Sequence, residues 1–213
     1  NDRFVDEAIA VTYCPLCGSG VAFKTEVTGY QLQFGVSGLL YNSDVLLYDR
    51  RTNSLWSQLL SKAITGLLKG NELTRIPIEH TTWADWRTQN PDTLVLSQDT
   101  GYRRDYKDNP YAGYDEHEGV YFPVSFRAQG YHPKEQVLGI QINNQAKAYP
   151  FVELAKAAKQ NVAEIKDEVA GQVITVRFDK THRAAKAFDA EGKQIAGTTL
   201  YWFAWFTFNP KTA

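Results

Sequence analysis

The chain has 213 residues and a net charge of -1, from 23 basic and 24 acidic residues. The length fits one large domain or two small ones, with enough chain to bury a hydrophobic core. The charge balance argues against a basic nucleic-acid-binding face, and no apolar run approaches the roughly 18 residues that cross a bilayer.

The first predicted strand covers residues 8–13, where apolar and polar residues alternate. It leads into Cys14-Pro15-Leu16-Cys17, which contains the only two cysteines of the chain. Gly18-Ser19-Gly20 follows and predicts a turn. The two thiols are therefore expected on a loop that leaves the end of a strand.

A β-meander is predicted next, from short apolar runs at 30–36, 39–41, 45–48 and 54–58 with turns at 42–44 and 49–53. Thr82 predicts the cap of a short helix at 83–89, which Asn90-Pro91 would end. Residues 93–96 predict another strand. The tyrosine-rich stretch 98–119 predicts a long ordered loop, and loops of that length are often functional.

A second unit is predicted to begin near Gln136, with strands at 137–142 and 146–149 joined by a hairpin turn at 143–144. Pro150 favours the first turn of a helix that runs from Phe151 to about Gln160. Further strands are expected at 173–178, 187–188 and 200–208. The last of these is the most apolar stretch of the chain and suits a buried strand.

The two ends of the chain resemble each other at an offset of 165 positions, with five identities and one aromatic exchange. The aligned residues are Asp2 and Asp167, Ile9 and Ile174, Val11 and Val176, Tyr13 and Phe178, Ala22 and Ala187, and Phe23 and Phe188. Cys14 then corresponds to Asp179 and Cys17 to His182, so the second copy would have lost the thiols.

We therefore predict an α+β fold that is predominantly β, with a few short helices and two related β-rich units formed by internal duplication. Residues 1–130 would form the unit with the cysteines, and residues 136–213 a second, degenerate unit packed on the first. The first copy lacks the hairpin and helix that lead the second copy. Because the chain starts at Asn1 and contains no methionine, we expect that a leading segment has been removed.

Cys14 and Cys17 are the candidate catalytic residues of a thiol-based oxidoreductase. Thiols at this spacing can cycle between dithiol and disulfide, with the thiolate as the attacking species. A thioredoxin-type arrangement is disfavoured, because Gly18 and Gly20 oppose the helix that such a site needs. A plain structural disulfide is also disfavoured, since so small a loop constrains the unfolded chain little.

Metal binding by the same two thiols is the alternative. A closed zinc site usually needs four ligands, and the sequence contains no second Cys-x-x-Cys and no paired histidines. Copper(I) accepts two thiolates, with His117 or His182 as a possible third ligand. No other cofactor is implied, because the chain has no phosphate-binding glycine loop, nucleophile elbow or His-Glu-x-x-His motif.

A non-enzymatic interaction module with a structural disulfide is the third possibility. The loop at 98–119 carries several tyrosines and the acidic run Asp115-Glu116-His117-Glu118, which together can form a ligand surface. We favour the simpler interpretation, in which this loop packs on the sheet.

Three motifs resemble a known family: Val11–Gly18 with its Cys-Pro-Leu-Cys core, Phe34–Tyr41, and Tyr48–Gln58. Together with Ala148-Tyr149-Pro150 and the later tryptophans, they resemble the bacterial and archaeal family labelled domain of unknown function 3179. The resemblance covers nearly the whole chain. Family members commonly carry an Ala-Tyr-Pro segment and a helix before the cysteine motif, and that piece is missing here.

The resemblance implies an extracytoplasmic location, periplasmic or at the cell surface, because similar proteins tend to be exported or lipid-anchored. Some relatives are described as selenoproteins, which favours redox chemistry at Cys14 and Cys17 over a structural role. The redox partner and substrate stay open. Other residues that match the family pattern have no assigned role, and for Trp56 we expect a place in the core.

Overall fold

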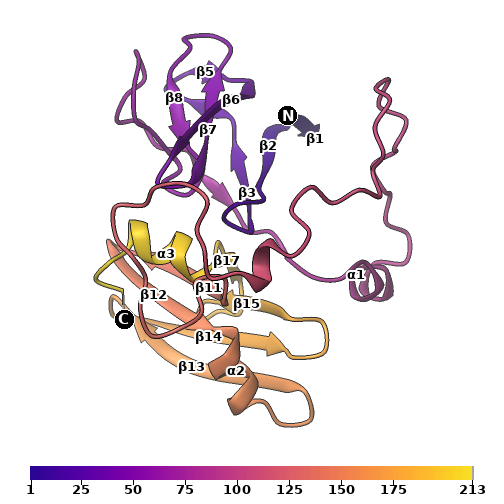
Figure 1. Cartoon of the computed structure of the whole chain (residues 1–213), viewed down its shortest axis with the longest axis vertical. Helices are drawn as coiled ribbons and strands as arrows, with labels where there is room; N and C mark the ends of the chain where they lie inside the picture. The colour runs from indigo at the N-terminus through magenta and orange to yellow at the C-terminus, as the bar shows by residue number, and fades with distance from the viewer. Residues whose placement is uncertain (213) are drawn as a thin grey trace.

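The structure is a computed structural model that describes residues 1–212. It is mostly β, with three short α-helices, which confirms the predicted β-rich α+β class. Four sheets of three or four antiparallel strands form a propeller-like arrangement, and β4 and β5 form a small additional ribbon. In Figure 1 the sheets of the N-terminal half lie above those of the C-terminal half, and α1 stands apart on a long connection.

The N-terminal half contains two of the four larger sheets. Their strand orders are β1-β2-β3-β10 and β6-β7-β8-β9. The bounds are β1 (Asp2–Phe4), β2 (Glu7–Cys14), β3 (Ser19–Lys24), β4 (Glu26–Val27), β5 (Tyr30–Gln31), β6 (Phe34–Tyr41), β7 (Asp44–Asp49), β8 (Leu55–Ser57), β9 (Lys62–Ala63), β10 (Arg75–Ile76), α1 (Trp83–Gln89) and the 3-10 turn η1 (Tyr114–Glu116).

The C-terminal half contains the other two larger sheets, ordered β12-β11-β17 and β13-β14-β15-β16. The bounds are β11 (Gln136–Ile142), β12 (Gln145–Pro150), α2 (Phe151–Ala157), β13 (Val162–Val169), β14 (Gln172–Asp179), β15 (Ala184–Phe188), β16 (Gln194–Ile195), β17 (Thr198–Tyr201) and α3 (Trp202–Phe208).

Several local predictions are confirmed. α1 begins and ends at the predicted residues, and the Thr82 hydroxyl accepts a hydrogen bond from the Asp85 amide at 3.2 Å, as an N-cap does. The β11–β12 hairpin turns at Asn143 and Asn144, both with positive φ, as a type I′ turn requires. The α2 helix starts at Phe151 as predicted and ends at Ala157, slightly earlier than expected.

Two predicted strands are wrong. Residues 93–96 form no strand, and Leu94 is 95% exposed, so their β propensity finds no partner strand. Residues 200–208 divide into the end of β17 and the helix α3. This stretch is apolar on all sides, and an apolar run without periodicity does not distinguish a buried helix from a buried strand.

Two clusters of buried side chains form the core. The larger contains Cys14, Cys17 and Trp56 together with Val137 and Phe203, so it joins residues from both sides of the predicted boundary at 130–136. The smaller lies within the C-terminal half, where α2, β11 and β12 pack against the sheet that begins with β13. The boundary itself stays a prediction, but the two halves share the core in which the cysteines are buried.

Candidate thiol site

The cysteine motif closes the β2–β3 hairpin. Cys14 is the last residue of β2 and pairs with Ser19, the first residue of β3. Between them the chain turns, and Gly18 adopts a φ of 60°, in the left-handed region that favours glycine. The predicted loop at a strand end is confirmed. Because a tight turn rather than a helix follows Cys17, no helix N-terminus is available to lower a thiol pKa.

Both cysteines are free thiols, 3.6 Å apart, with exposed fractions of 1% for Cys14 and 0% for Cys17. Their sulfurs lie 3.9 and 3.5 Å from the carbonyl oxygen of Ser43, in the turn between β6 and β7. A hydrogen bond from Cys17 lowers the pKa of Cys14, whereas the same contact and burial raise the pKa of Cys17. The pair is therefore asymmetric, and Cys14 is the thiol that ionises more easily.

Asp44 places a buried carboxyl group beside the thiols. One of its oxygens lies within 4.8 Å of both sulfurs. Its Oδ2 accepts hydrogen bonds from the Ser57 hydroxyl at 2.8 Å and the Leu59 amide at 3.0 Å, whereas Oδ1 is buried without a partner among residues 1–212. Burial raises the pKa of Asp44 to about 7, although these hydrogen bonds oppose the rise.

Arg75, on β10, is the nearest compensating charge. Its guanidinium lowers the pKa of Asp44, and it donates hydrogen bonds to the Leu59 carbonyl and, at 3.2 Å, to the Thr198 hydroxyl. Burial lowers the pKa of Arg75 to about 10, which leaves it charged at neutral pH. Because Thr198 lies on β17, this arginine links the thiol region to the C-terminal half.

A chain of polar side chains anchors the hairpin that carries the thiols. The Ser19 hydroxyl donates to Gln58 Oε1 at 2.7 Å, and Gln58 Nε2 donates to the Thr12 hydroxyl at 3.0 Å. Ser19 and Gln58 are fully buried. Buried polar groups of this kind are costly unless they are hydrogen-bonded, so the satisfied chain fixes the register between β2, β3 and the segment after β8.

Asp49 and Trp56, which match the family pattern, have structural roles. Trp56 is fully buried, as predicted, and its indole N–H donates to Asp49 Oδ2 at 3.0 Å. Asp49 also accepts from the amide and hydroxyl of Thr52, at 2.6 and 2.8 Å. Burial alone would raise the pKa of Asp49, but these hydrogen bonds lower it overall. The group stabilises the turn between β7 and β8.

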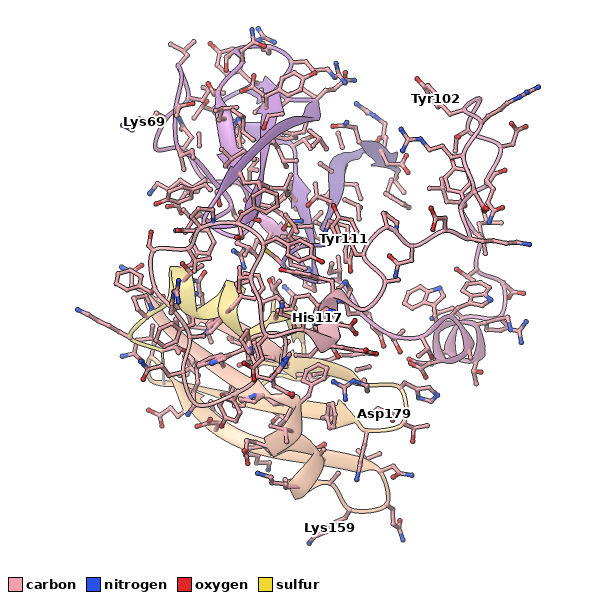
Figure 2. All side chains as sticks on the ribbon, in the orientation of Figure 1. Lys69, Tyr102, Tyr111, His117, Lys159 and Asp179 are labelled. Atoms are coloured by element: carbon pink, nitrogen blue, oxygen red, sulfur yellow. The ribbon has the colours of Figure 1, made fainter. Side chains whose placement is uncertain are left out.

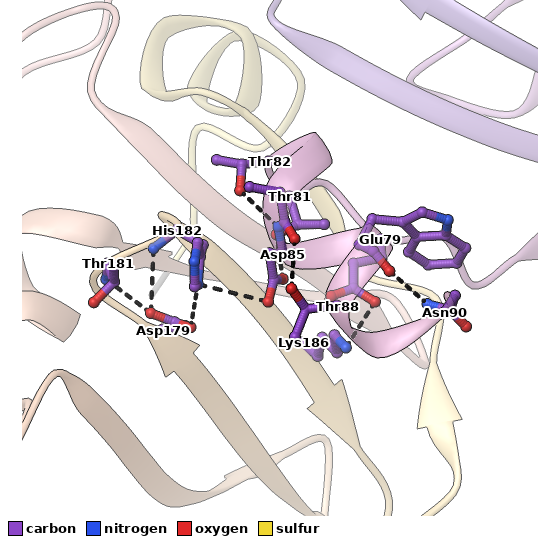
Figure 3. Close-up of polar contacts among 12 residues, drawn as sticks. Glu79, Thr81, Thr82, Asp85, Thr88, Asn90, Asp179, Thr181, His182 and Lys186 are labelled. Atoms are coloured by element: carbon purple, nitrogen blue, oxygen red, sulfur yellow. Dashed lines mark hydrogen bonds and ion pairs between the residues drawn. The ribbon is translucent and has the colours of Figure 1, made fainter. Parts of the chain in front are cut away.

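Neither histidine proposed as a third thiol ligand lies in the thiol cluster. Among residues 1–212, the third side chain grouped with Cys14 and Cys17 is Asp44. His182 Nδ1 instead lies 2.7 Å from Asp179 Oδ2 and 3.6 Å from Asp85 Oδ1, so it joins β14 to α1 (Figure 3). His117 is exposed, and its carbonyl accepts a hydrogen bond from Lys134.

Sequence reasoning missed Asp44 and His80. The sequence predicts a turn at Asp44, and nothing in the local pattern separates a turn aspartate from a buried one. The His80 ring lies 6.0 Å from that of Tyr13, next to the cysteine motif, and burial lowers its pKa. A histidine that occurs singly in the sequence gives no signal of this placement.

The tyrosine-rich loop divides into two parts. Tyr114 is buried, with its ring 4.4 Å from that of Tyr121 and 6.2 Å from that of Tyr201. Tyr111 lies against the body of the protein, whereas Tyr102 is exposed at the far end of the loop (Figure 2). The expectation that the loop packs on the sheet therefore holds around Tyr114 but not at the tip.

The fold and the site define a β-rich α+β protein with a buried Cys-x-x-Cys pair and a carboxyl group beside it. The chain belongs to the family described as "Protein of unknown function (DUF3179)", which matches residues 1–212 and confirms the resemblance. No curated protein and no solved structure matches this chain. Within residues 1–212, none of the helices combines the length and the apolar character needed to cross a membrane.

Proposed function

We propose that this protein is an extracytoplasmic thiol oxidoreductase in which Cys14 and Cys17 form the redox pair. The observation that carries the proposal is the contact between two free thiols 3.6 Å apart, in a turn that closes a hairpin. A small movement of either side chain brings the sulfurs to the ~2 Å of a disulfide bond. The lowered pKa of Cys14 supports its role as the attacking thiol.

The reaction follows thiol–disulfide exchange. The Cys14 thiolate attacks one sulfur of a substrate disulfide, which breaks the substrate S–S bond and releases the first substrate thiol after it takes up a proton. The Cys17 sulfur then loses its proton and attacks Cys14 in the mixed disulfide. This step releases the second substrate thiol. The substrate disulfide is reduced by two electrons, and the protein pair is oxidised to a disulfide.

The burial of both cysteine side chains means that the exchange reaction requires a movement that exposes them. Because Cys14 and Cys17 are almost fully buried, a substrate sulfur reaches them only when the turn at 15–18 or a side chain covering it moves.

The extracytoplasmic location is supported by the resemblance to exported relatives. Such compartments allow disulfides to form and persist.

Two single variants test the mechanism. We expect Cys17→Ser to form a stable mixed disulfide with a small aromatic disulfide reagent, because Cys14 attacks and no second thiol resolves the product. Cys14→Ser should form little of this product, because burial, which also raises the pKa of Cys17, remains in this variant. Mass spectrometry of the folded variants gives the readout, and exchange that continues in both variants would refute the redox role.

Soft-metal binding is the second candidate, and the unpartnered Asp44 oxygen favours it. The two thiolates suit copper(I), and the two thiolates with a carboxylate within 4.8 Å suit zinc; a metal ion bound by the carboxylate would satisfy Oδ1, which has no partner among residues 1–212. The test is whether one equivalent of metal stays bound through gel filtration with a competing chelator, and whether Asp44→Asn weakens it. An interaction module with a structural disulfide would instead tolerate loss of both thiols.

We also infer that the two ends of the chain arose by duplication. The sheets β1-β2-β3-β10 and β13-β14-β15-β16 have the same antiparallel order, and the residue pairs among the first three strands of each sheet recur at a constant offset of 165. This register supports the inference more strongly than the few identities do. The recurring pairs include Asp2–Ile9 with Asp167–Ile174, Val11–Ala22 with Val176–Ala187, and Ala10–Phe23 with Thr175–Phe188.

A further inference from the structure

A polar cavity of about 670 Å³ lies beside the cysteine turn. The residues that flank the motif on its two sides, Tyr13 and Gly18, both line it. Tyr201 lines it as well, and its amide donates a hydrogen bond to the Cys17 carbonyl at 2.8 Å. The cavity therefore directly borders the backbone of the thiol loop.

The two glycines after Cys17 allow this approach. A Cβ at Gly18 would lie 2.9 Å from the ring of Tyr201, and a Cβ at Gly20 would lie 2.7 Å from His80 Nε2. Both contacts are too close for a real side chain, so each glycine lets a cavity-lining side chain pack against the turn. Tyr201 covers Gly18, and burial raises its pKa to about 12, which keeps the phenol protonated. Movement of this ring would open the loop toward the cavity.

The cavity wall carries both signs of charge. Lys134 and Arg183 supply cations, and Glu79, Asp115 and Glu135 supply carboxylates. Glu79 Oε2 pairs with Lys186 at 2.7 Å, but its Oε1 is buried with no hydrogen-bond partner among residues 1–212. A buried acceptor in that state has lost its water without gaining a donor, which is unfavourable. Because Oε1 has almost no exposed surface, a ligand with a charged N–H donor would remove this penalty only once a neighbouring side chain moves aside.

We propose that this cavity binds a small disulfide carrying both ammonium and carboxylate groups, as the substrate of the thiol pair. The inference rests on the proposed redox function and adds the substrate class. A purely anionic ligand would face the carboxylates of Glu79 and Asp115, and a purely cationic one would face Lys134 and Arg183. In the reaction the ligand S–S bond breaks, two zwitterionic thiols leave with the two protons of Cys14 and Cys17, and the protein disulfide forms.

Binding is tested separately from redox chemistry on the intact wild-type protein. Lanthionine has the charged groups of cystine but a thioether in place of the disulfide, so it cannot exchange. Calorimetry should show one saturable site with a Kd below about 1 mM, the range expected for a few charged contacts. Absence of saturable binding would overturn the proposal about the cavity, whatever the thiols do.

Matched variants locate the site. Glu79→Gln should raise the lanthionine Kd by about tenfold, since hydrogen bonds to charged groups contribute about 1.5 kcal/mol or more. Glu72→Gln is the control, because Glu72 also pairs with a lysine but does not line the cavity. Asp115→Asn should weaken binding about threefold, as expected for an exposed charge, and its neighbour Glu116→Gln should not. If the two variants of each pair, cavity residue and control, changed the lanthionine Kd equally, lanthionine would not bind in this cavity.

The redox arm compares cystine with 2-hydroxyethyl disulfide, a neutral disulfide, as oxidants of the reduced protein. Faster oxidation by cystine, with a preference that falls in Glu79→Gln, supports the proposal. Equal rates with both reagents would refute the substrate class and leave the redox function standing. If the protein binds lanthionine but exchanges with neither disulfide, the cavity binds the ligand and the redox function is refuted.

Discussion

Replacing Asp44 with asparagine should make the protein more stable at neutral pH and remove a pH dependence. The carboxyl group has a pKa of about 7 in the folded protein and an ordinary value of 3.8, because burial disfavours its charged form. The folded state therefore holds this proton more tightly than the unfolded state does. The stabilisation that comes from this tighter proton binding is complete below about pH 4 and is lost as the pH rises to about 7.

The magnitude follows from the difference between the two pKa values. Each pKa unit corresponds to about 1.4 kcal/mol, so the loss across this range is about 4 kcal/mol. The asparagine side chain would avoid the loss, because an amide does not ionise. Its oxygen can accept the hydrogen bonds from Ser57 and Leu59 that Oδ2 accepts now, and its nitrogen would take the place of Oδ1, which has no partner among residues 1–212.

Urea unfolding between pH 4 and pH 8 measures the effect. Asp44→Asn should match the wild type near pH 4 and exceed its free energy of unfolding by about 4 kcal/mol near pH 8. The difference between the two curves cancels every other titrating group. A difference that does not change with pH would refute the conclusion that Asp44 is a buried, reluctantly ionised carboxyl group.

Asp49→Asn is the matched control, because Asp49 lies at the other end of β7 and is equally buried. Hydrogen bonds from Trp56 and Thr52 outweigh burial and lower its pKa, so its ionised form stabilises the fold. This contribution is present above the unfolded pKa and is lost as the pH falls through the folded pKa. Asp49→Asn should therefore be less stable than wild type at neutral pH and approach it in acid.

Two further predictions concern the C-terminal half. A hydrogen bond from His182 to the Asp179 carboxylate and the charge of Asp85 raise the pKa of His182. Its link to α1 should therefore be complete below about pH 6.5 and weaken as the pH rises through the raised pKa. NMR titration should give a pKa above 6.5 for His182, and this pKa should fall in Asp179→Asn. Gly139→Ala should destabilise the protein by about 1–3 kcal/mol in chemical unfolding, because the new Cβ would lie 2.2 Å from the ring of Trp205. An unchanged unfolding midpoint would show that α3 does not pack tightly on β11.

The sequence by itself determined the features that neighbouring residues encode. The Cys14–Cys17 turn at a strand end, the Thr82 cap and the Asn143–Asn144 hairpin all depend on contacts within a few positions. Backbone propensity and side-chain capping act over that range, so the local sequence is sufficient to predict these turns and this cap. The family also followed from contiguous motifs.

Only the tertiary structure decided which groups surround the thiols. Asp44 approaches Cys14 from another hairpin, and His182 lies with Asp179 and Asp85 instead of with the cysteines. The same applies to residues 202–208, a mostly apolar segment that forms a helix and places Trp205 against Gly139. These outcomes depend on which side chains burial brings together across long sequence separations, and neither local propensity nor periodicity carries that information.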